Sequence, residues 1–345
     1  MENNTILNMI NYDSLKKIDS GEMHKTYDIW PQIAYESYKN PNTKIKLKKS
    51  SHLVFAGMGG SGAIGEVFSA ILSKTNTHVT IVKGFHLPKT VKNNSLVIIT
   101  SVSGNTLESI TILEKARKIG AKILVFSSGG KIEGICKEKK IVHFNIKKYH
   151  SPRASFTAFL YFMLGVLKPI LPIEEDDILE SIIQLKRLGK NINSKNISKS
   201  NQAIKIAEWI NFNPIIYFPL GLQSAATRFK NSIQENCKMH IITEDVIEAC
   251  HNGIVAWEEP SNFQVFLLRG RDDVEETIQL WKILKKYFDK NKIKYNEIMS
   301  VDGNILTKLV CLIYLLDYSS IYLAIKREID PTPVKSIEFI KKEMN

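Results

Sequence analysis

The chain has 345 residues, of which 44% are apolar and 24% charged, an ordinary composition for a globular protein with a hydrophobic core. This length predicts two domains or one large one. The 47 Lys and Arg residues outnumber the 35 Asp and Glu residues and give a formal net charge of +12. Three classes of partner fit that excess: nucleic acid, an anionic membrane surface, or a small anionic substrate.

The sequence disfavours secretion, a membrane location and a metal site. The N-terminus has no basic start followed by an apolar run, and no segment reaches the roughly 18 apolar residues that a membrane span needs. The four cysteines form no CxxC pair, and the eight histidines form no HxxH or HExxH pattern. We therefore expect a cytoplasmic protein with buried free thiols, no metal site and no membrane contact.

The first half of the chain predicts helices and then a series of alternating strands and helices. Residues 1–45 are polar with scattered aromatic side chains, which predicts helices that pack on a domain, and a basic linker follows at Lys44–Lys49. Short apolar runs then alternate with helical stretches. Strands are predicted from His52 and at 78–84, 95–104, 121–130 and 141–146. This alternation is typical of βαβ units in a buried parallel sheet.

The second half repeats this organisation after a helical connection. Residues 155–209 predict helices with a polar break at 191–200. Strands are predicted at 214–221, 263–270 and 294–301, with a weaker signal at 240–245, and a long apolar helix at 305–325. We therefore predict an α/β fold with two similar doubly wound parallel-sheet lobes joined by helices.

A glycine-rich turn, Gly57–Gly62, connects the first predicted strand to its helix and satisfies GxGxxG. Glycines let the backbone approach an anion, and a helix N-terminus supplies free N–H groups. A dinucleotide site also needs an acidic residue after the second strand, but that strand ends in Lys83-Gly84-Phe85. The turn therefore favours a phosphate group over NAD, with a purely structural tight turn as the remaining alternative.

A second turn, Ser101–Thr106, lies at the carboxyl end of the third predicted strand, where ligands bind in doubly wound sheets. Alone it would be an ordinary helix cap, but together with the glycine turn it predicts a neutral cradle for a phosphate. A third turn, Ser127–Gly130, either walls this pocket or is structural. No Walker Gly-Lys-Ser/Thr follows a strand, so a small monophosphate fits better than a nucleoside triphosphate.

These turns resemble those of sugar isomerase (SIS) domains, and the doubled lobe resembles the phosphoglucose isomerase superfamily. More closely, the chain resembles the bifunctional phosphoglucose/phosphomannose isomerases from about residue 50 to the C-terminus. The stretches that carry this resemblance are Pro152-Arg153-Ala154, Arg228–Lys238, His251–Glu258 and Ser319–Val334. The order of predicted elements divides the chain into an N-terminal helical segment (1–45), a first lobe (46–150), a helical connection (151–210) and a second lobe with a C-terminal helix (211–345), and the resemblance implies that both lobes are SIS domains.

The resemblance also implies roles for individual residues. Glu235 would be the base that moves a proton between C1 and C2, and Arg153 would stabilise the enediolate oxygen. His251 would reach in from a partner subunit to assist ring opening, together with Lys326. The phosphate would be bound by Ser61, Ser101, Ser103 and Thr106, with the amides of Gly59 and Gly60.

The chemistry of aldose–ketose isomerisation fits this set. It needs a carboxylate near C1 and C2, a fixed positive charge where negative charge develops, and an acid–base group for the ring oxygen. No metal, nicotinamide or other cofactor is required. Two departures concern the ring-opening group, because Cys250 and Gly253 stand where the family usually has Asn and an acidic residue. Ser319, aligned with a small hydroxyl residue of the dual-specificity group, favours acceptance of the mannose epimer.

The sequence therefore predicts reversible isomerisation of glucose 6-phosphate and mannose 6-phosphate with fructose 6-phosphate, by a homodimer that completes its site with His251. A non-catalytic sugar-phosphate-binding SIS regulator and a related amino-sugar-phosphate isomerase are the alternatives. Nucleic acid is disfavoured as a partner because the basic residues are scattered among acidic ones and no RNA- or zinc-binding motif is present.

Overall fold

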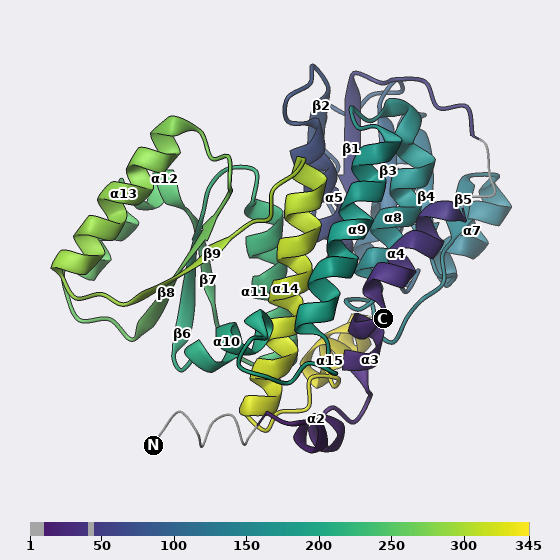
Figure 1. Cartoon of the computed structure of the whole chain (residues 1–345). Helices are drawn as coiled ribbons and strands as arrows, with labels where there is room; N and C mark the ends of the chain where they lie inside the picture. The colour runs from purple at the N-terminus through teal and green to yellow at the C-terminus, as the bar shows by residue number, and fades with distance from the viewer. Residues whose placement is uncertain (1–9, 41–44, 345) are drawn as a thin grey trace.

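The computed structural model describes residues 10–40 and 45–344, and it contains two parallel sheets with flanking helices (Figure 1). The first sheet has five strands in the order β2-β1-β3-β4-β5, and all neighbours are parallel. The predicted strands of the first lobe are confirmed. They are β1 (His52–Ala56), β2 (His78–Val82), β3 (Leu96–Ser101), β4 (Lys122–Ser127) and β5 (Val142–Asn145).

Helices cover the first sheet and continue toward the N-terminus as far as Tyr12. The described part of the N-terminal segment contains three helices. Residues 1–9 and the start of the predicted Lys44–Lys49 linker lie outside the described residues. The helix α4 packs on α8 and α9, so the N-terminal segment belongs to the core. The helices are α2 (Tyr12–Ile18), α3 (Met23–Asp28), α4 (Trp30–Lys39), α5 (Gly60–Leu72), α6 (Leu107–Ile119), α7 (Lys131–Lys139), α8 (Phe156–Leu167) and α9 (Glu175–Ile192).

The second sheet has four strands in the order β7-β6-β8-β9, again all parallel. Its strands are β6 (Asn213–Phe218), β7 (Ile242–Asp245), β8 (Phe263–Arg269) and β9 (Tyr295–Met299). The associated helices are α10 (Gln202–Trp209), α11 (Gln223–Cys237), α12 (Val246–Ala249), α13 (Glu275–Lys290), α14 (Ile305–Lys326) and α15 (Lys335–Glu343), with short 3-10 turns at Lys168–Ile170 and Gly253–Trp257. The predictions missed α12 and α15, which are short or exposed.

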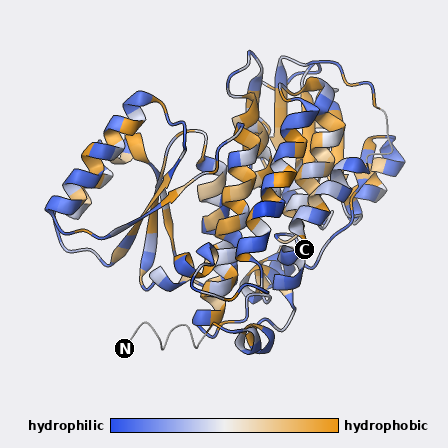
Figure 2. Ribbon diagram, in the orientation of Figure 1, coloured by the Kyte–Doolittle hydropathy of each residue, from blue (hydrophilic) through white to orange (hydrophobic). Residues whose placement is uncertain are grey.

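The long helix α14 lies between the two lobes and joins them (Figure 1). It contacts α5 of the first lobe, α9 of the connection, and α10 and α11 of the second lobe. By length and composition α14 could cross a membrane, but its apolar window is 100% buried inside the protein. Figure 2 shows the same pattern, with apolar residues concentrated in the sheets and in the central helices.

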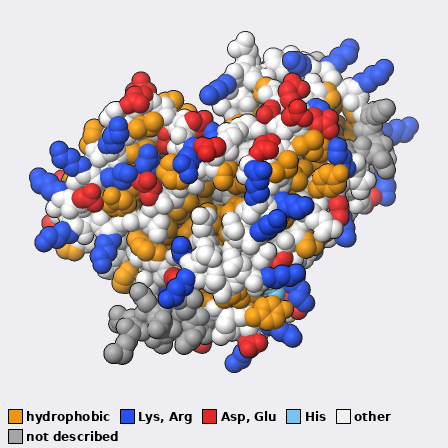
Figure 3. All heavy atoms as spheres, in the orientation of Figure 1, with side chains coloured by type: hydrophobic (Ala, Val, Ile, Leu, Met, Phe, Trp, Pro, Cys, Tyr) orange, Lys and Arg blue, Asp and Glu red, His pale blue; other side chains and the backbone are white. Residues whose placement is uncertain are grey.

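The visible surface carries mixed charges, and three of the four cysteines are buried. Lys and Arg side chains are spread over the visible face with Asp and Glu among them (Figure 3). Cys136, Cys237 and Cys311 are buried free thiols as predicted, whereas Cys250 is only partly buried. Burial raises the pKa of Cys136 to about 11 and that of Cys311 to about 12, so both remain protonated thiols at neutral pH.

Candidate functional site

The glycine turn lies at the carboxyl end of β1 and packs directly on the end of β3. A Cβ on Gly57 would lie 3.0 Å from both the Ser61 Cβ and the Thr100 carbonyl oxygen, so a larger residue would push the two turns apart. Gly59 has φ +53, a conformation that favours glycine. Helix α5 begins at Gly60, and the amides of Gly59 and Gly60 donate to no carbonyl within the described residues. They are therefore available to an anion at this helix N-terminus.

The hydroxyl turn supplies the second side of this cradle. The Ser101 hydroxyl donates to the Thr106 hydroxyl at 3.0 Å. Thr106 is the N-cap residue of α6, yet its side chain makes no capping hydrogen bond. The Ser103 hydroxyl accepts from the Asn105 amide at 3.3 Å. Two hydroxyls therefore lie together in front of a helix N-terminus without capping it, which suits binding of an anion.

The third turn supports the hydroxyl turn. Its Ser127 hydroxyl is bonded within the turn, whereas the buried Ser128 hydroxyl has no hydrogen-bond partner among the described residues. The Ser127 hydroxyl donates to the Gly129 carbonyl at 2.9 Å and lies 2.7 Å from the His143 Nε2. A Cβ on Gly104 would lie only 1.7 Å from the Gly129 carbonyl oxygen. The Lys131 amide also donates to the Asn105 side chain at 2.8 Å. Of the two interpretations that the sequence allows, these contacts favour the structural one.

Arg153 and Glu235 form an ion pair although they are far apart in the sequence. The Arg153 Nη1 lies 3.0 Å from the Glu235 Oε2, and the two side chains are 4% and 24% exposed. The Arg153 Nε donates to the Asn236 Oδ1 at 2.8 Å, and its Nη2 donates to the carbonyls of Pro331 and Thr332 at 2.6 and 3.1 Å. The buried guanidinium is therefore held by four acceptors, and the carboxylate is partly open to solvent.

A second arginine joins this pair to the phosphate cradle. The Arg228 Nη2 donates to the Arg153 carbonyl at 2.6 Å, and a Cβ on Gly60 would lie 2.8 Å from the Arg228 Nη1 and 3.7 Å from the Arg153 Cα. Arg228 is itself paired with Asp317 of α14, with an Nη2 to Oδ2 distance of 2.7 Å. The glycine turn and the Arg153–Glu235 pair are therefore adjacent. Arg228 and Asp317 were not identified as site residues from the sequence, although Arg228 lies in a stretch that carries the family resemblance.

His251 lies apart from this pair within one chain. It follows α12 on the edge of the second sheet and is exposed. Within the described residues, no hydrogen bond or ion pair links its imidazole to Glu235 or Arg153. Its amide donates to the Glu248 carbonyl at 2.9 Å, which fixes the turn without engaging the ring. The structure therefore shows no direct contact between His251 and the Arg153–Glu235 pair within one chain.

Lys326 and Ser319 have other partners. The Lys326 Nζ lies 2.8 Å from the Glu208 carbonyl, 3.0 Å from the Ile210 carbonyl and 2.9 Å from the Asn211 Oδ1, so it caps the C-terminus of α10. Burial lowers its pKa. Ser319 is 0% exposed, and its hydroxyl donates to the Leu315 carbonyl at 2.7 Å within its own helix. The structure therefore does not bring either predicted residue to Glu235.

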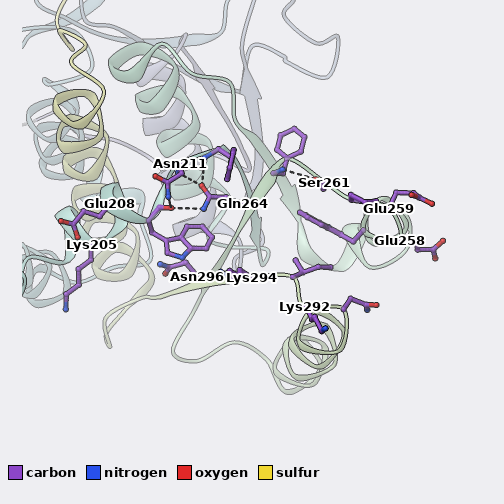
Figure 4. Close-up of a pocket in the computed structure, with 17 residues that line it drawn as sticks. Lys205, Glu208, Asn211, Glu258, Glu259, Ser261, Gln264, Lys292, Lys294 and Asn296 are labelled. Atoms are coloured by element: carbon purple, nitrogen blue, oxygen red, sulfur yellow. Dashed lines mark hydrogen bonds between the residues drawn. The ribbon is translucent and has the colours of Figure 1, made fainter. Parts of the chain in front are cut away.

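A cavity of about 1020 Å³ lies elsewhere, at the amino ends of β6, β8 and β9 (Figure 4). Gln264 organises one side of it by accepting from the Phe212 amide at 2.7 Å and donating to the Trp209 carbonyl at 3.0 Å. None of the predicted site residues lines this cavity. Because parallel strands place their carboxyl ends at one edge, the cavity and the β6–α11 turn lie at opposite ends of the second sheet.

Comparison with known proteins identifies both lobes. Residues 46–157 match the SIS domain family, and residues 199–344 match the bacterial phospho-glucose isomerase C-terminal SIS domain. The bifunctional phosphoglucose/phosphomannose isomerase of Caldicellulosiruptor bescii is 30% identical over 327 residues, which cover 91% of this chain and 95% of the relative. The chain belongs to the bifunctional phosphoglucose/phosphomannose isomerase family.

Other members and solved structures agree with this assignment. The bifunctional phosphoglucose/phosphomannose isomerase of Aquifex aeolicus is also 30% identical, over 85% of this chain and 90% of its own. A hypothetical protein from Thermus thermophilus has a TM-score of 0.69 at 12% identity and covers 99% of this chain and 94% of its own. The C-terminal domain of glucosamine-fructose-6-phosphate aminotransferase from Francisella tularensis has a TM-score of 0.65 at 14% identity, over 88% of this chain and 96% of its own. These structures confirm the fold.

One departure from the bifunctional phosphoglucose/phosphomannose isomerase pattern has a visible structural counterpart. A Cβ on Gly253 would lie 2.7 Å from both carboxylate oxygens of Glu244, on the adjoining strand β7. The absence of a side chain at Gly253 thus leaves room for the Glu244 carboxylate beneath the His251 turn. Burial, and then the charge of Glu248, raise the pKa of Glu244.

Proposed function

We propose that this protein reversibly isomerises fructose 6-phosphate to glucose 6-phosphate and mannose 6-phosphate. The observation that carries the proposal is the Arg153–Glu235 ion pair beside the two phosphate-binding turns. It combines a carboxylate, a buried cation and an anion cradle in one place, which are the groups that an enediolate mechanism needs. Membership of the family supports the same reaction.

In the proposed reaction the phosphate is bound by neutral groups. The hydroxyls of Ser61, Ser101, Ser103 and Thr106, and the amides of Gly59 and Gly60, would face its oxygens. The N-termini of α5 and α6 add positive dipole ends without a fixed charge. Orientation of the sugar, rather than neutralisation of the phosphate, is what this cradle contributes.

Glu235 would carry the proton between C1 and C2. Its Oε2 accepts from Arg153, whereas its Oε1 accepts no hydrogen bond within the described residues. This second oxygen is thus available to the substrate while the bonded one keeps the carboxylate oriented. Arg153 would stabilise the oxygen on which negative charge develops.

Ring opening would depend on His251 of a second copy. The histidine is exposed, and its ring makes no hydrogen bond within the part of the chain that the structure describes, so it is accessible to a partner. Lys326 has no part in this proposal because its ammonium already has acceptors at the end of α10. The active form would therefore be a homodimer, and its free thiols fit a cytoplasmic location.

The direct test is to add chelator-treated protein to fructose 6-phosphate and to quantify glucose 6-phosphate and mannose 6-phosphate separately. Both products should form. Absence of both would refute the enzyme, and glucose 6-phosphate alone would refute dual specificity. Glu235→Gln should lower kcat by about 100-fold or more and leave sugar-phosphate binding within a few fold, since general base catalysis typically contributes about 10²–10⁴-fold.

The dimer can be tested by complementation between inactive variants. Glu235→Gln and His251→Gln proteins are unfolded together, refolded as an equal mixture and assayed. About one quarter of the parental rate should return, because about half of the dimers are mixed and each has one intact site. If His251 acted within its own chain, the mixture would remain inactive.

A further inference from the structure

The orientation of Arg153 depends on a segment near the C-terminus. Two of its four hydrogen bonds go to the carbonyls of Pro331 and Thr332, which lie 178 and 179 residues further along the chain. Carbonyl positions depend on the course of the backbone, so any shift of residues 330–332 would move the guanidinium. We refer to Asp330–Thr332 as the tail strap.

The tail strap is held from one side by the second lobe. The Lys238 Nζ, at the end of α11, lies 3.3 Å from the Asp330 carbonyl and 3.4 Å from the Pro331 carbonyl, and it donates to the Glu235 carbonyl at 2.6 Å. Burial, and then the charge of Arg153, lower the pKa of Lys238. The strap is therefore attached to the helix that carries the catalytic carboxylate.

The N-terminal segment holds the strap from the other side. The Ser20 hydroxyl donates to the Asp330 Oδ2 at 2.5 Å, and the Asp330 Oδ1 accepts from the Thr332 amide at 2.9 Å. At Gly21 the backbone approaches closely, since a Cβ there would lie 2.5 Å from the Thr332 Oγ1 and 2.7 Å from the His150 Nε2. The turn of residues 19–21 thus touches both the strap and the segment that leads into Arg153.

Hydrogen bonds to the Asp19 side chain hold this turn. Asp19 is 0% exposed, and its Oδ2 accepts from the His24 amide at 2.9 Å and lies 2.7 Å from the His24 Nδ1. Burial opposes the charge on Asp19, but the hydrogen bonds from His24 outweigh it and hold the pKa of Asp19 below its usual value. A buried, bonded carboxylate fixes the course of the backbone into Ser20 and Gly21.

We infer that the N-terminal turn and the tail strap form a clamp that positions Arg153, and that Gly21 and Asp330 are its positioning residues. Within the described residues, no hydrogen bond or ion pair links either residue to Glu235, and Gly21 lies outside both matched SIS regions, 46–157 and 199–344. The segment before the first lobe would therefore be part of the catalytic apparatus. The effect of the clamp on turnover rests on the proposed function, whereas its hold on Arg153 does not.

The perturbation is Gly21→Ala, which introduces a methyl group within 2.5 Å of the Thr332 Oγ1 and 2.7 Å of the His150 Nε2, so both side chains must move. A displacement of the order of 1 Å can cost about 100-fold in rate, so we expect kcat to fall about 10- to 100-fold while KM changes less than about threefold. Gly134→Ala is the matched control, because a Cβ there meets nothing within 4 Å. It should keep the parental kcat.

Asp330 provides a second, independent route to the same effect. Asp330→Ala removes both side-chain acceptors and should lower kcat in the same way, whereas Asp330→Asn keeps an acceptor for Thr332 and should restore most of it. The double variant with Gly21→Ala should lose less than the product of the two single losses, because both act through one strap. Multiplicative losses, or no rescue by asparagine, would contradict the clamp.

The rate at which phenylglyoxal modifies Arg153 measures how firmly the clamp holds its guanidinium, and this test needs no substrate. Arg153 is 4% exposed in the parent protein. In Gly21→Ala and Asp330→Ala its modification, followed by peptide mapping, should be several-fold faster than in the parent and in Gly134→Ala. Equal rates would overturn the inference even if the protein proved inactive, whereas an inactive parent with accelerated modification would refute only the proposed reaction.

Discussion

Replacing Asp317 by asparagine would test the buried ion pair that joins α11 to α14 beneath the site. Arg228 and Asp317 are 1% and 0% exposed, and the Arg228 Nε and Nη2 lie 2.9 and 2.7 Å from the Asp317 Oδ2. Burial alone would lower the pKa of Arg228, but the charge and the hydrogen bond of Asp317, with smaller contributions from other neighbours, together outweigh burial and raise that pKa. The folded protein therefore contains a buried ion pair.

The size of the effect follows from the burial of the pair. Removing one charge from a buried ion pair leaves the other uncompensated and typically costs about 3–5 kcal/mol. Asparagine can still accept one N–H from Arg228, so we expect a loss near the lower limit, about 3 kcal/mol. Domains are stabilised by only about 5–15 kcal/mol, so this is a large fraction of the free energy of unfolding.

Urea denaturation monitored by tryptophan fluorescence would measure this loss. The double variant Arg228→Met, Asp317→Leu should recover most of it, because apolar replacement of a buried pair is often close to neutral. The matched control is the exposed Glu22–Lys25 pair, whose side chains are 46% and 57% exposed. Glu22→Gln should leave the free energy of unfolding close to that of the parent, because solvent screens an exposed pair. The reasoning fails if Asp317→Asn costs no more than this control, or if the double variant is no better than the single one.

Four further outcomes follow from the site and its surroundings. Ser101→Ala should weaken binding of fructose 6-phosphate about 10-fold or more in calorimetry, because a hydrogen bond to a charged group is worth about 1.5–3 kcal/mol; unchanged affinity would remove Ser101 from the cradle. Gly104→Ala should lower the free energy of unfolding by about 2–5 kcal/mol, since overpacking against a carbonyl adds to the strain of φ +67. Lys326→Met should lower the melting temperature with kcat little changed, and a loss of kcat of about 100-fold at full stability would restore its ring-opening role. Burial, and then a neighbouring carboxylate, raise the pKa of Glu244 above 4.5; the folded state therefore binds this proton more tightly than the unfolded chain, and stability is lost as pH rises through the window above 4.5. Glu244→Gln should thus be more stable than the parent at about pH 7 in urea denaturation, with an advantage that disappears below about pH 4.5.

The strands and the phosphate turns could be predicted because their signals are local. An apolar run that ends in Gly57 or in Ser101 marks both a buried strand and the turn that follows it. The register of the parallel sheet then brings those two turns to one edge without further information. The fold class and the proximity of these two turns were therefore accessible from the sequence.

The neighbours that the side chains of α14 contact could not be predicted from the sequence in the same way. The helix is buried along almost its whole length, so apolar side chains surround it and no period distinguishes one face from another. The alignment that matched Ser319 and Lys326 to site residues could not indicate which neighbours each would meet. Asp317, two residues before Ser319, pairs with Arg228 beneath the site, while Lys326 reaches the end of α10.

In the proposed reaction, the charges at the site would let a phosphate cradle made of neutral groups suffice. In the resting protein the charge of Arg153 is balanced by Glu235 at 3.0 Å, and that of Arg228 by Asp317. When Glu235 accepts the proton from the substrate in the proposed reaction, it becomes neutral and Arg153 loses its counter-charge. At that moment negative charge develops on the substrate oxygen, and the same buried cation can balance it. The stabilisation is therefore largest in the transition state, which is where binding energy lowers the barrier. An additional fixed cation at the phosphate would strengthen ground-state binding without this selectivity, and most of the net charge of +12 lies outside the site.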